Sequence, residues 1–194
     1  MLVFKNIEEM KPYYNEETNT YKFEENSRML DISIEFDFVC LANITARDIK
    51  AKNINCKNII ADNIESYDII AENVKVREFV SASEIKVKLR LSARTIESET
   101  IEAGKISAVY VTATHSINAC NIVATSIVTL YLNANCINTH EISAKEISYS
   151  HYLINSQSII CMSIKERKEA LHIYGDFRMG FYIQKPPTEK EGAK

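Results

Sequence analysis

The residue types that most often do chemistry are few and scattered in this chain. The four histidines stand singly, at His115, His140, His151 and His172. The sequence contains no GxSxG, HExxH, Walker A or GxGxxG motif, and it holds four glycines in all. A phosphate-cradling loop needs glycines so that backbone N–H groups can approach the phosphate. We therefore expect neither an enzyme nor a cofactor-binding protein.

Five cysteines are present, and no two of them have CxxC spacing. Cys120 and His140 are twenty residues apart, which equals one coil of the architecture derived below and would stack the two side chains. A metal site needs at least a third ligand, and the sequence suggests none. Cysteines without a pairing pattern are typical of a reducing compartment.

One basic cluster, formed by Lys86, Lys88, Arg90 and Arg94, is the candidate nucleic-acid patch. Strand alternation predicts the first three on one outer face. Acidic residues flank the cluster, and the chain has a net charge of -3. Direct nucleic-acid binding is therefore a minority interpretation, because phosphate binding depends on a basic surface.

These residues must be positioned by a repeat that runs from Leu41 to Ile164. An apolar, mostly β-branched residue recurs every five residues, and a small residue follows it two places later. With short insertions before Ile85, Leu91, Ile117 and Ile154, we count 23 units with 18 isoleucines in the apolar slot and 12 alanines in the small slot. A short period repeated many times indicates a solenoid rather than a helix or a flat sheet.

The repeat predicts an all-β protein in which each unit forms one side of a coil. With four units and about 20 residues per turn, the repeat forms about six coils and a rod roughly 30 Å long. This register places Asp68 under Arg90 and Arg90 under Tyr110, with Tyr131 one coil further on. On the neighbouring side it places Glu84 opposite Lys105. Pairs of this kind specify register more than they stabilise the fold.

Stretches such as ADNIE (61–65) and AENVK (71–75) resemble the pentapeptide-repeat proteins. The resemblance covers about two thirds of the chain and implies the right-handed quadrilateral β-helix of that family. The phase differs, because the small residue here follows the large one by two. Some members of the family mimic DNA with an acidic rod and block DNA gyrase, whereas this repeat has 12 basic and 12 acidic residues. An acidic stripe through Asp48, Asp62, Asp68, Glu72 and the N-terminal cap keeps that function open.

Both ends of an open solenoid need caps, because unpaired strand edges promote association. Residues 1–40 form the predicted N-terminal cap, in which 30–39 alternate as a strand after a hairpin or short helix. The β-helix occupies 41–164. A C-terminal cap hairpin is predicted for 165–184, with two strands within 171–183, and 185–194 form a disordered tail by composition. The N-terminal cap carries 4 basic and 9 acidic residues.

No Asp, Glu, Lys or Arg occurs in residues 106–140, although a quarter of the chain is charged. The outward positions of this uncharged belt include Val109, Tyr110, Val123, Val128, Leu130 and Tyr131. Exposed apolar patches of this kind mark contacts with other proteins. The alternative is a β-helix surface that tolerates small polar and apolar residues without a partner.

These observations favour a non-enzymatic binding or inhibitory scaffold that presents a wall or cap to another protein. A sharper version is a DNA-mimic inhibitor of a nucleic-acid-handling complex, of the topoisomerase or phage-defence (CRISPR) type. A homodimer through the belt or a cap is a further expectation, and a structural, self-assembling β-helix is the alternative. No apolar run is long enough to span a membrane, and Glu8 and Glu9 interrupt any signal peptide, so we expect a cytoplasmic protein.

Overall fold

The computed structural model describes residues 1–166, without the side chains of His151, Tyr152, 154–158 and 165–166. The hairpin predicted within 171–183 and the tail of 185–194 lie outside the described residues. Twelve strands and one 3-10 helix are present in the described part. Their bounds are β1 Leu2–Phe4, η1 Ile7–Tyr13, β2 Tyr14–Asn15, β3 Thr20–Lys22, β4 Glu24–Glu25, β5 Arg28–Met29, β6 Ile32–Val39, β7 Asn43–Thr45, β8 Asp48–Ser92, β9 Thr95–Ser107, β10 Tyr110–Val123, β11 Ser126–Ile160 and β12 Ser163–Glu166.

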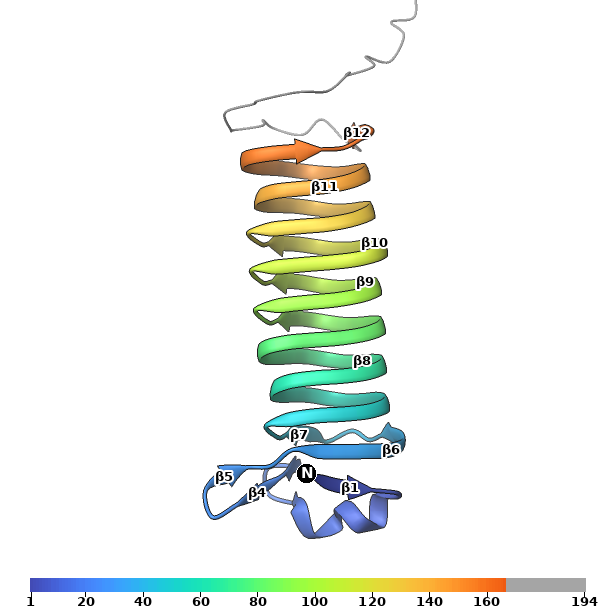
Figure 1. Ribbon diagram of the computed structural model, residues 1–194, viewed down its shortest axis with the longest axis vertical. Coiled ribbons are helices and arrows are strands. Elements are labelled where there is room, and N and C mark those ends of the chain that lie inside the picture. The colour runs from blue at the N-terminus through green and yellow to red at the C-terminus, as the bar shows by residue number, and fades with distance from the viewer. Residues whose placement is uncertain (167–194) are drawn as a thin grey trace, which may run out of the picture.

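The long strands do not run straight but wind around a common axis, so that each turn pairs in parallel with the turn below it (Figure 1). The result is a rod with the N-terminal cap at one end. Parallel pairing runs from β6 and β7 through β8, β9, β10 and β11 to β12. The predicted β-solenoid is confirmed.

The prediction of four units per turn is wrong, because the register shows three. Ile44 pairs with Ile59, fifteen residues later, Ile85 with Ile101, sixteen later, and Ile147 with Ile164, seventeen later. The solenoid therefore has about eight turns instead of about six. A five-residue period fixes the length of a side, but every side has the same pattern, so the number of sides per turn is not encoded in it.

Each turn has three sides, which we number by the apolar residues that stack in their inward columns. Side 1 carries Ile44, Ile59, Val74, Leu91, Ile106, Ile122, Ile137 and Leu153. Side 2 carries Ile32, Ile49, Ile64, Val80, Ile96, Val111, Ile127, Ile142 and Ile159. Side 3 carries Phe38, Ile54, Ile69, Ile85, Ile101, Ile117, Leu132, Ile147 and Ile164.

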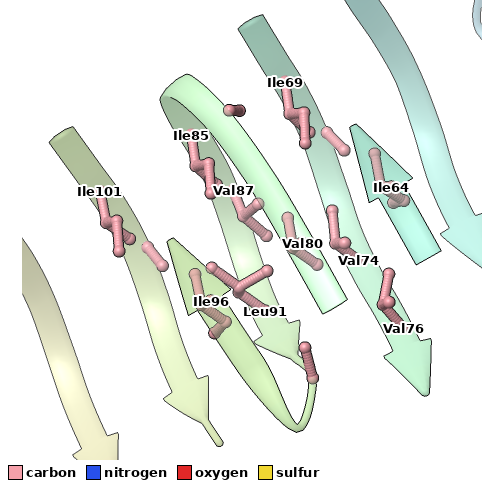
Figure 2. Close-up of a cluster of buried hydrophobic side chains, with 14 of the residues drawn as sticks. Ile64, Ile69, Val74, Val76, Val80, Ile85, Val87, Leu91, Ile96 and Ile101 are labelled. Carbon is pink, nitrogen blue, oxygen red and sulfur yellow. The ribbon is translucent and has the colours of Figure 1, made fainter. Parts of the chain in front are cut away.

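The apolar columns meet in a single core that runs the length of the shaft. Figure 2 shows Ile85, Leu91 and Ile96, from three successive sides, turned toward the shared interior. Most of the small residues are also buried and lie next to a corner, where two sides converge and leave little room, whereas Ala51 and Ala108 are partly buried. This volume constraint accounts for the pairing of Ile with Ala.

The phase of the repeat differs from the prediction at two places. Near the C-terminal end, the predicted insertion before Ile154 is wrong, because Leu153 is the fully buried residue in the apolar slot of side 1. The second difference lies near Val80. Val80 and Ala82 are buried, whereas Phe79 and Ser81, which the repeat pattern predicts inside, are only half-buried. The extra residue therefore lies before Val80 instead of before Ile85. The sequence around it, EFVSAS, offers two apolar residues in a row, and packing selects the β-branched valine over the larger phenylalanine.

Hydroxyl side chains replace alanine in some corner positions without leaving an unpaired polar group. The Ser98 hydroxyl donates to the carbonyl of Thr100 at 2.8 Å or that of Ser83 in the turn below at 3.0 Å. Thr139 has the same two choices, toward Glu141 and Thr125. A local carbonyl acceptor therefore makes a polar residue tolerable at these inward positions.

The N-terminal cap is built around aromatic residues. Phe4, Tyr13 and Phe23 have ring centroids 5.1–5.6 Å apart, and Phe23 and Met10 are fully buried. β1 pairs in parallel with β6, and the β2–β3 hairpin pairs with β7. The alternating segment 30–39 contains strand β6, and the segment before it forms both a short helix, η1, and two hairpins, where the sequence predicts one or the other. Because β6 already pairs with β8, the first coil begins inside the region assigned to the cap.

Candidate interaction surfaces

Exposed apolar side chains of the upper half of the rod gather on side 2 and its two edges. Val128 and Ile160 point outward from the middle of this side, and both are about half exposed. The corner leading into side 2 carries Val109 and Tyr110, and the corner leaving it carries Leu130 and Met162. We call this set the side 2 patch: Val109, Tyr110, Val128, Leu130, Ile160 and Met162.

Five of the six outward residues predicted in the uncharged belt therefore lie on side 2 or its edges, and Val123 lies on side 1. Tyr131 is half-buried at the corner leaving side 2. Its ring meets the His115 ring edge-on, with centroids 5.6 Å apart, and Lys145 Nζ lies 5.7 Å above the same ring. These two contacts account for the partial burial of the Tyr131 ring, whereas the neighbouring Leu130 is exposed.

Charged residues bracket the central part of the side 2 patch, from Val109 to Leu130. The turn of Ile96 carries Arg94, Glu97 and Glu99, and the turn of Ile142 carries Glu141 and Lys145. The two turns between them, those of Val111 and Ile127, carry no Asp, Glu, Lys or Arg. Backbone hydrogen bonds fix the stacking at one edge, from Val109 to Arg94, from Thr125 to Val109 and from Glu141 to Thr125.

The basic cluster is not one face. A register shift between Val87 and Arg90 interrupts the alternation, so Lys86 lies on side 3 while Arg90 begins side 1. Lys88 is exposed at the corner between these sides. Arg94 lies at the edge of side 2, where its guanidinium is 3.4 Å from the Glu78 carboxylate.

Lys86 is also neutralised locally. Its ammonium lies 2.9 Å from the Glu84 carboxylate, and this hydrogen bond raises the pKa of Lys86.

The side-chain stacks predicted from a twenty-residue turn are absent. Arg90 pairs in register with Lys105, and Glu84 pairs with Thr100. Tyr110 lies between Thr95 and Ser126.

Asp48 and Asp68 do not share a stripe. Asp48 lies at the corner that leads into side 2 and accepts a hydrogen bond from Asn63 at 2.8 Å. Asp68 lies at the corner leaving side 2, and Glu72 at the corner leaving side 3. The acids that look periodic in the sequence are thus distributed around the rod.

Asparagines that precede the apolar slot form ladders between turns. Asn58 donates to Asn43 at 2.7 Å, and Asn73 donates to Asn58 at 2.8 Å. Asn53 donates to Asp37 in the same way on side 3. These residues are structural, since they link consecutive turns at half-buried positions.

The described cysteines do not form the candidate metal or thiolate site that the sequence suggested. Cys120 lies beside Asn121 at the corner leaving side 3, whereas His140 lies at the corner leading into side 2, so the predicted stack is wrong. Burial raises the pKa of the Cys56 thiol to about 12. No group of three potential metal ligands occurs in residues that the structure describes.

The described wall has shallow depressions instead of an enclosed pocket. A depression of about 560 Å³ on side 3 is lined by residues that include Lys86, Glu102, Gly104 and Cys120. Flat walls of this kind suit contacts with macromolecules better than small ligands.

No helix in the part covered by the structure is long and apolar enough to cross a membrane.

Compared with protein-family models, with curated proteins and with solved structures, the chain matches none of them. Function is therefore inferred from the surfaces themselves.

Two features of these surfaces are missed when the sequence is read with four sides per turn. Oppositely charged residues recur fifteen or sixteen positions apart, as in Lys50–Glu65 and Arg47–Asp31, and this spacing would have indicated three sides. Ile160 and Met162, which continue the side 2 patch, fall on it only once three sides are assigned.

Proposed function

We propose that this protein is a non-enzymatic, protein-binding scaffold: a rigid β-solenoid that presents side 2 to a protein partner. The observation that supports it is the clustering of exposed apolar residues on one side. Of the eight large apolar residues exposed from Val109 onward in the described chain, six belong to the side 2 patch. Its central part, Val109, Tyr110, Val128 and Leu130, lies on two successive turns of side 2 that carry no Asp, Glu, Lys or Arg, and contiguous exposed apolar patches usually mark contacts with other proteins.

The proposal places the protein in the cytoplasm. Five cysteines are unpaired. Cys120 is exposed, and an exposed thiol persists more readily in a reducing compartment. We propose that the five-residue repeat shares its origin with that of the pentapeptide-repeat proteins. The proposal does not extend to their four-sided coil, since this rod has three units per turn.

An inhibitor that mimics DNA, directed at a topoisomerase or a CRISPR-type complex, is a narrower form of the proposal. The acidic N-terminal cap supports it. On the coils, however, several carboxylates have basic neighbours, among them Asp37 with Lys52 and Glu65 with Lys50. We therefore place the contact on the side 2 patch and not on an acidic stripe.

End-to-end self-assembly ranks below these functions. β1, η1 and the β2–β3 hairpin cover the N-terminal end of the rod, and Met10 and Phe23 are fully buried there. Polymerisation through that end would require this cap to open. Filaments in a sedimentation series at rising concentration would favour the structural alternative.

The test is affinity capture of the tagged protein from host-type lysate, with nuclease, comparing two double variants. Val128→Glu with Leu130→Lys alters the side 2 patch without changing the net charge. Ile60→Glu with Ile70→Lys is the matched control, because these residues are equally exposed on sides 1 and 3. We expect a stoichiometric protein partner that the control retains and the patch variant loses. Capture that both variants retain would contradict the proposal.

A further inference from the structure

The charges that bracket the central part of the side 2 patch are arranged as a two-fold axis would require. Arg94 and Glu141 lie at one edge of side 2, three turns apart, and Glu99 and Lys145 lie at the other edge, also three turns apart. At each edge one charge is basic and the other acidic. The midpoint between them falls between the turns of Val111 and Ile127.

We propose that side 2 binds side 2 of a second copy of this chain, with the two rods antiparallel and the two-fold axis at that midpoint. This inference rests on the proposed function, because it names the partner of the surface that the proposal already assigns. An antiparallel two-fold arrangement brings each edge of side 2 against the same edge of the partner, at the opposite height.

Charge complementarity follows directly from this geometry. Lys145 comes opposite the partner's Glu99, and Glu141 comes beside the partner's Arg94, one position along the edge. Symmetry repeats both contacts, so four ion pairs surround the uncharged centre. Glu97 comes opposite the partner's Ser143 and meets no like charge. Charged pairs at a rim of this kind specify orientation more than they supply affinity.

Side-chain size is complementary in the same arrangement. Tyr110 comes opposite the partner's Ser126, and Val128 comes opposite the partner's Thr112. Leu130, at the edge, comes opposite the partner's Thr114. The larger or more apolar side chain therefore meets a short hydroxyl residue at each of these positions, so two bulky side chains never collide. Close packing of two flat walls requires this alternation.

The C-terminal end of the patch also contacts the second copy in this arrangement. One turn beyond the charged bracket, Ile160 and Met162 are 53% and 78% exposed. The two-fold axis brings Ile160 opposite the partner's Ser81 and Met162 opposite the partner's Ser83. Six turns of side 2, from that of Val80 to that of Ile159, thus take part.

The size of this surface indicates a weak or moderate dimer. The six turns of side 2 extend about 29 Å along the rod, and the five residues of side 2 in each turn span about 16 Å across it. The two facing walls together therefore bury on the order of 900 Å² of surface. Specific interfaces usually bury at least about 1,000 Å², and smaller ones belong to weak complexes. We expect dissociation constants in the micromolar range.

The test combines sedimentation velocity, on the full chain from about 1 to 300 µM, with charge reversal. The wild-type protein should convert from monomer to dimer. Glu99→Lys and Lys145→Glu should each weaken the dimer about tenfold, because each creates two like-charge contacts. The double variant Glu99→Lys with Lys145→Glu should restore it. In a parallel dimer Glu99 would face Arg94 and Lys145 would face Glu141, and the double variant would be the weakest.

Thermal melting of each variant confirms that folding is intact. A wild-type protein that stays monomeric throughout, or a double variant weaker than either single one, overturns the inference. A dimer that Val128→Glu with Leu130→Lys leaves unchanged also overturns it. If the purified protein is monomeric while the patch variant loses a partner from lysate, the proposed function stands and only the second copy is wrong. If neither dimer nor partner depends on the patch, both fail.

Discussion

At the scale of single residues, Gly104 shows how one turn constrains the next. A Cβ atom at this position would lie 2.7 Å from the carbonyl oxygens of both Lys88 and Leu89. These two residues belong to the irregular segment between Val87 and Arg90, which bulges into the space above it. Backbone atoms cannot move aside as a side chain could, so the position requires glycine.

Gly104→Ala should lower the free energy of unfolding by about 1–3 kcal/mol, the usual cost of forcing an extra methyl group into a packed site. Thermal or chemical denaturation measures it. Cys120→Ala, at the equivalent corner one turn higher, is the control and should change stability by less than about 0.5 kcal/mol. Equal stability of Gly104→Ala and the wild type would show that the bulge is not where the structure has it.

Cys56 should resist alkylation while Cys120 reacts. Burial raises the pKa of Cys56 to about 12, so the nucleophilic thiolate is scarce at pH 8 and the thiol is also inaccessible. Cys120 is exposed on the wall. Iodoacetamide labelling followed by peptide mass spectrometry measures both rates in one sample. Equal rates in the folded protein would contradict the burial of Cys56.

The same pKa gives a pH dependence with a defined sign. The folded state holds the Cys56 proton more tightly than the unfolded state, so its contribution to stability is complete below the ordinary thiol pKa of about 8.5. It is lost as the pH rises from there toward about 12. The stability difference between the wild type and Cys56→Ala should therefore shrink over that window. A difference independent of pH would be the contrary result.

At the scale of elements, the asparagine ladder links the first turns of side 1. Asn58 both donates to Asn43 and accepts from Asn73, and all three side chains are half-buried. Asn58→Ala should cost about 1–2 kcal/mol, because it removes two hydrogen bonds and leaves their partners partly unsatisfied. Denaturation of this variant is compared with that of Asn138→Ala, which removes an exposed amide. The ladder has no structural role if both variants lose the same small amount.

The sequence predicts the type of the elements but not the number of sides in each turn. The period of five and the Ile–Ala alternation predict the solenoid, and the alternation in 30–39 predicts the strand that begins it. The number of sides is not predictable in this way, because Ile44, Ile49 and Ile54 occupy equivalent slots whether three or four sides close the turn. Every stacking contact between turns depends on that number, so the predicted Cys120–His140 and Asp68–Arg90 pairs are wrong. The exposure of Tyr110, Val128 and Leu130 depends only on alternation and is predicted correctly.

At the scale of the whole molecule, the N-terminal cap protects the end of the rod. Phe23 is fully buried among Phe4, Tyr13 and Tyr21. Phe23→Ala should cost about 3–5 kcal/mol locally. Because turns of a solenoid contact only their neighbours, the loss should affect the nearest turns first. Hydrogen exchange should then accelerate in β6 and β7 while β10 keeps its protection. Uniform acceleration along the rod would indicate a fully cooperative fold instead.

The rod as a whole has one side that differs from the other two, and its role as a contact surface is the central claim. Hydroxyl-radical footprinting tests it most directly, in purified protein over a concentration series and in any captured complex. Tyr110 on side 2 and Tyr67, at the same side's far corner in a lower turn, are both exposed in the free rod. We predict that oxidation of Tyr110, Val128 and Leu130 falls on association while oxidation of Tyr67 does not. Unchanged oxidation of Tyr110 in an associated state would contradict the claim.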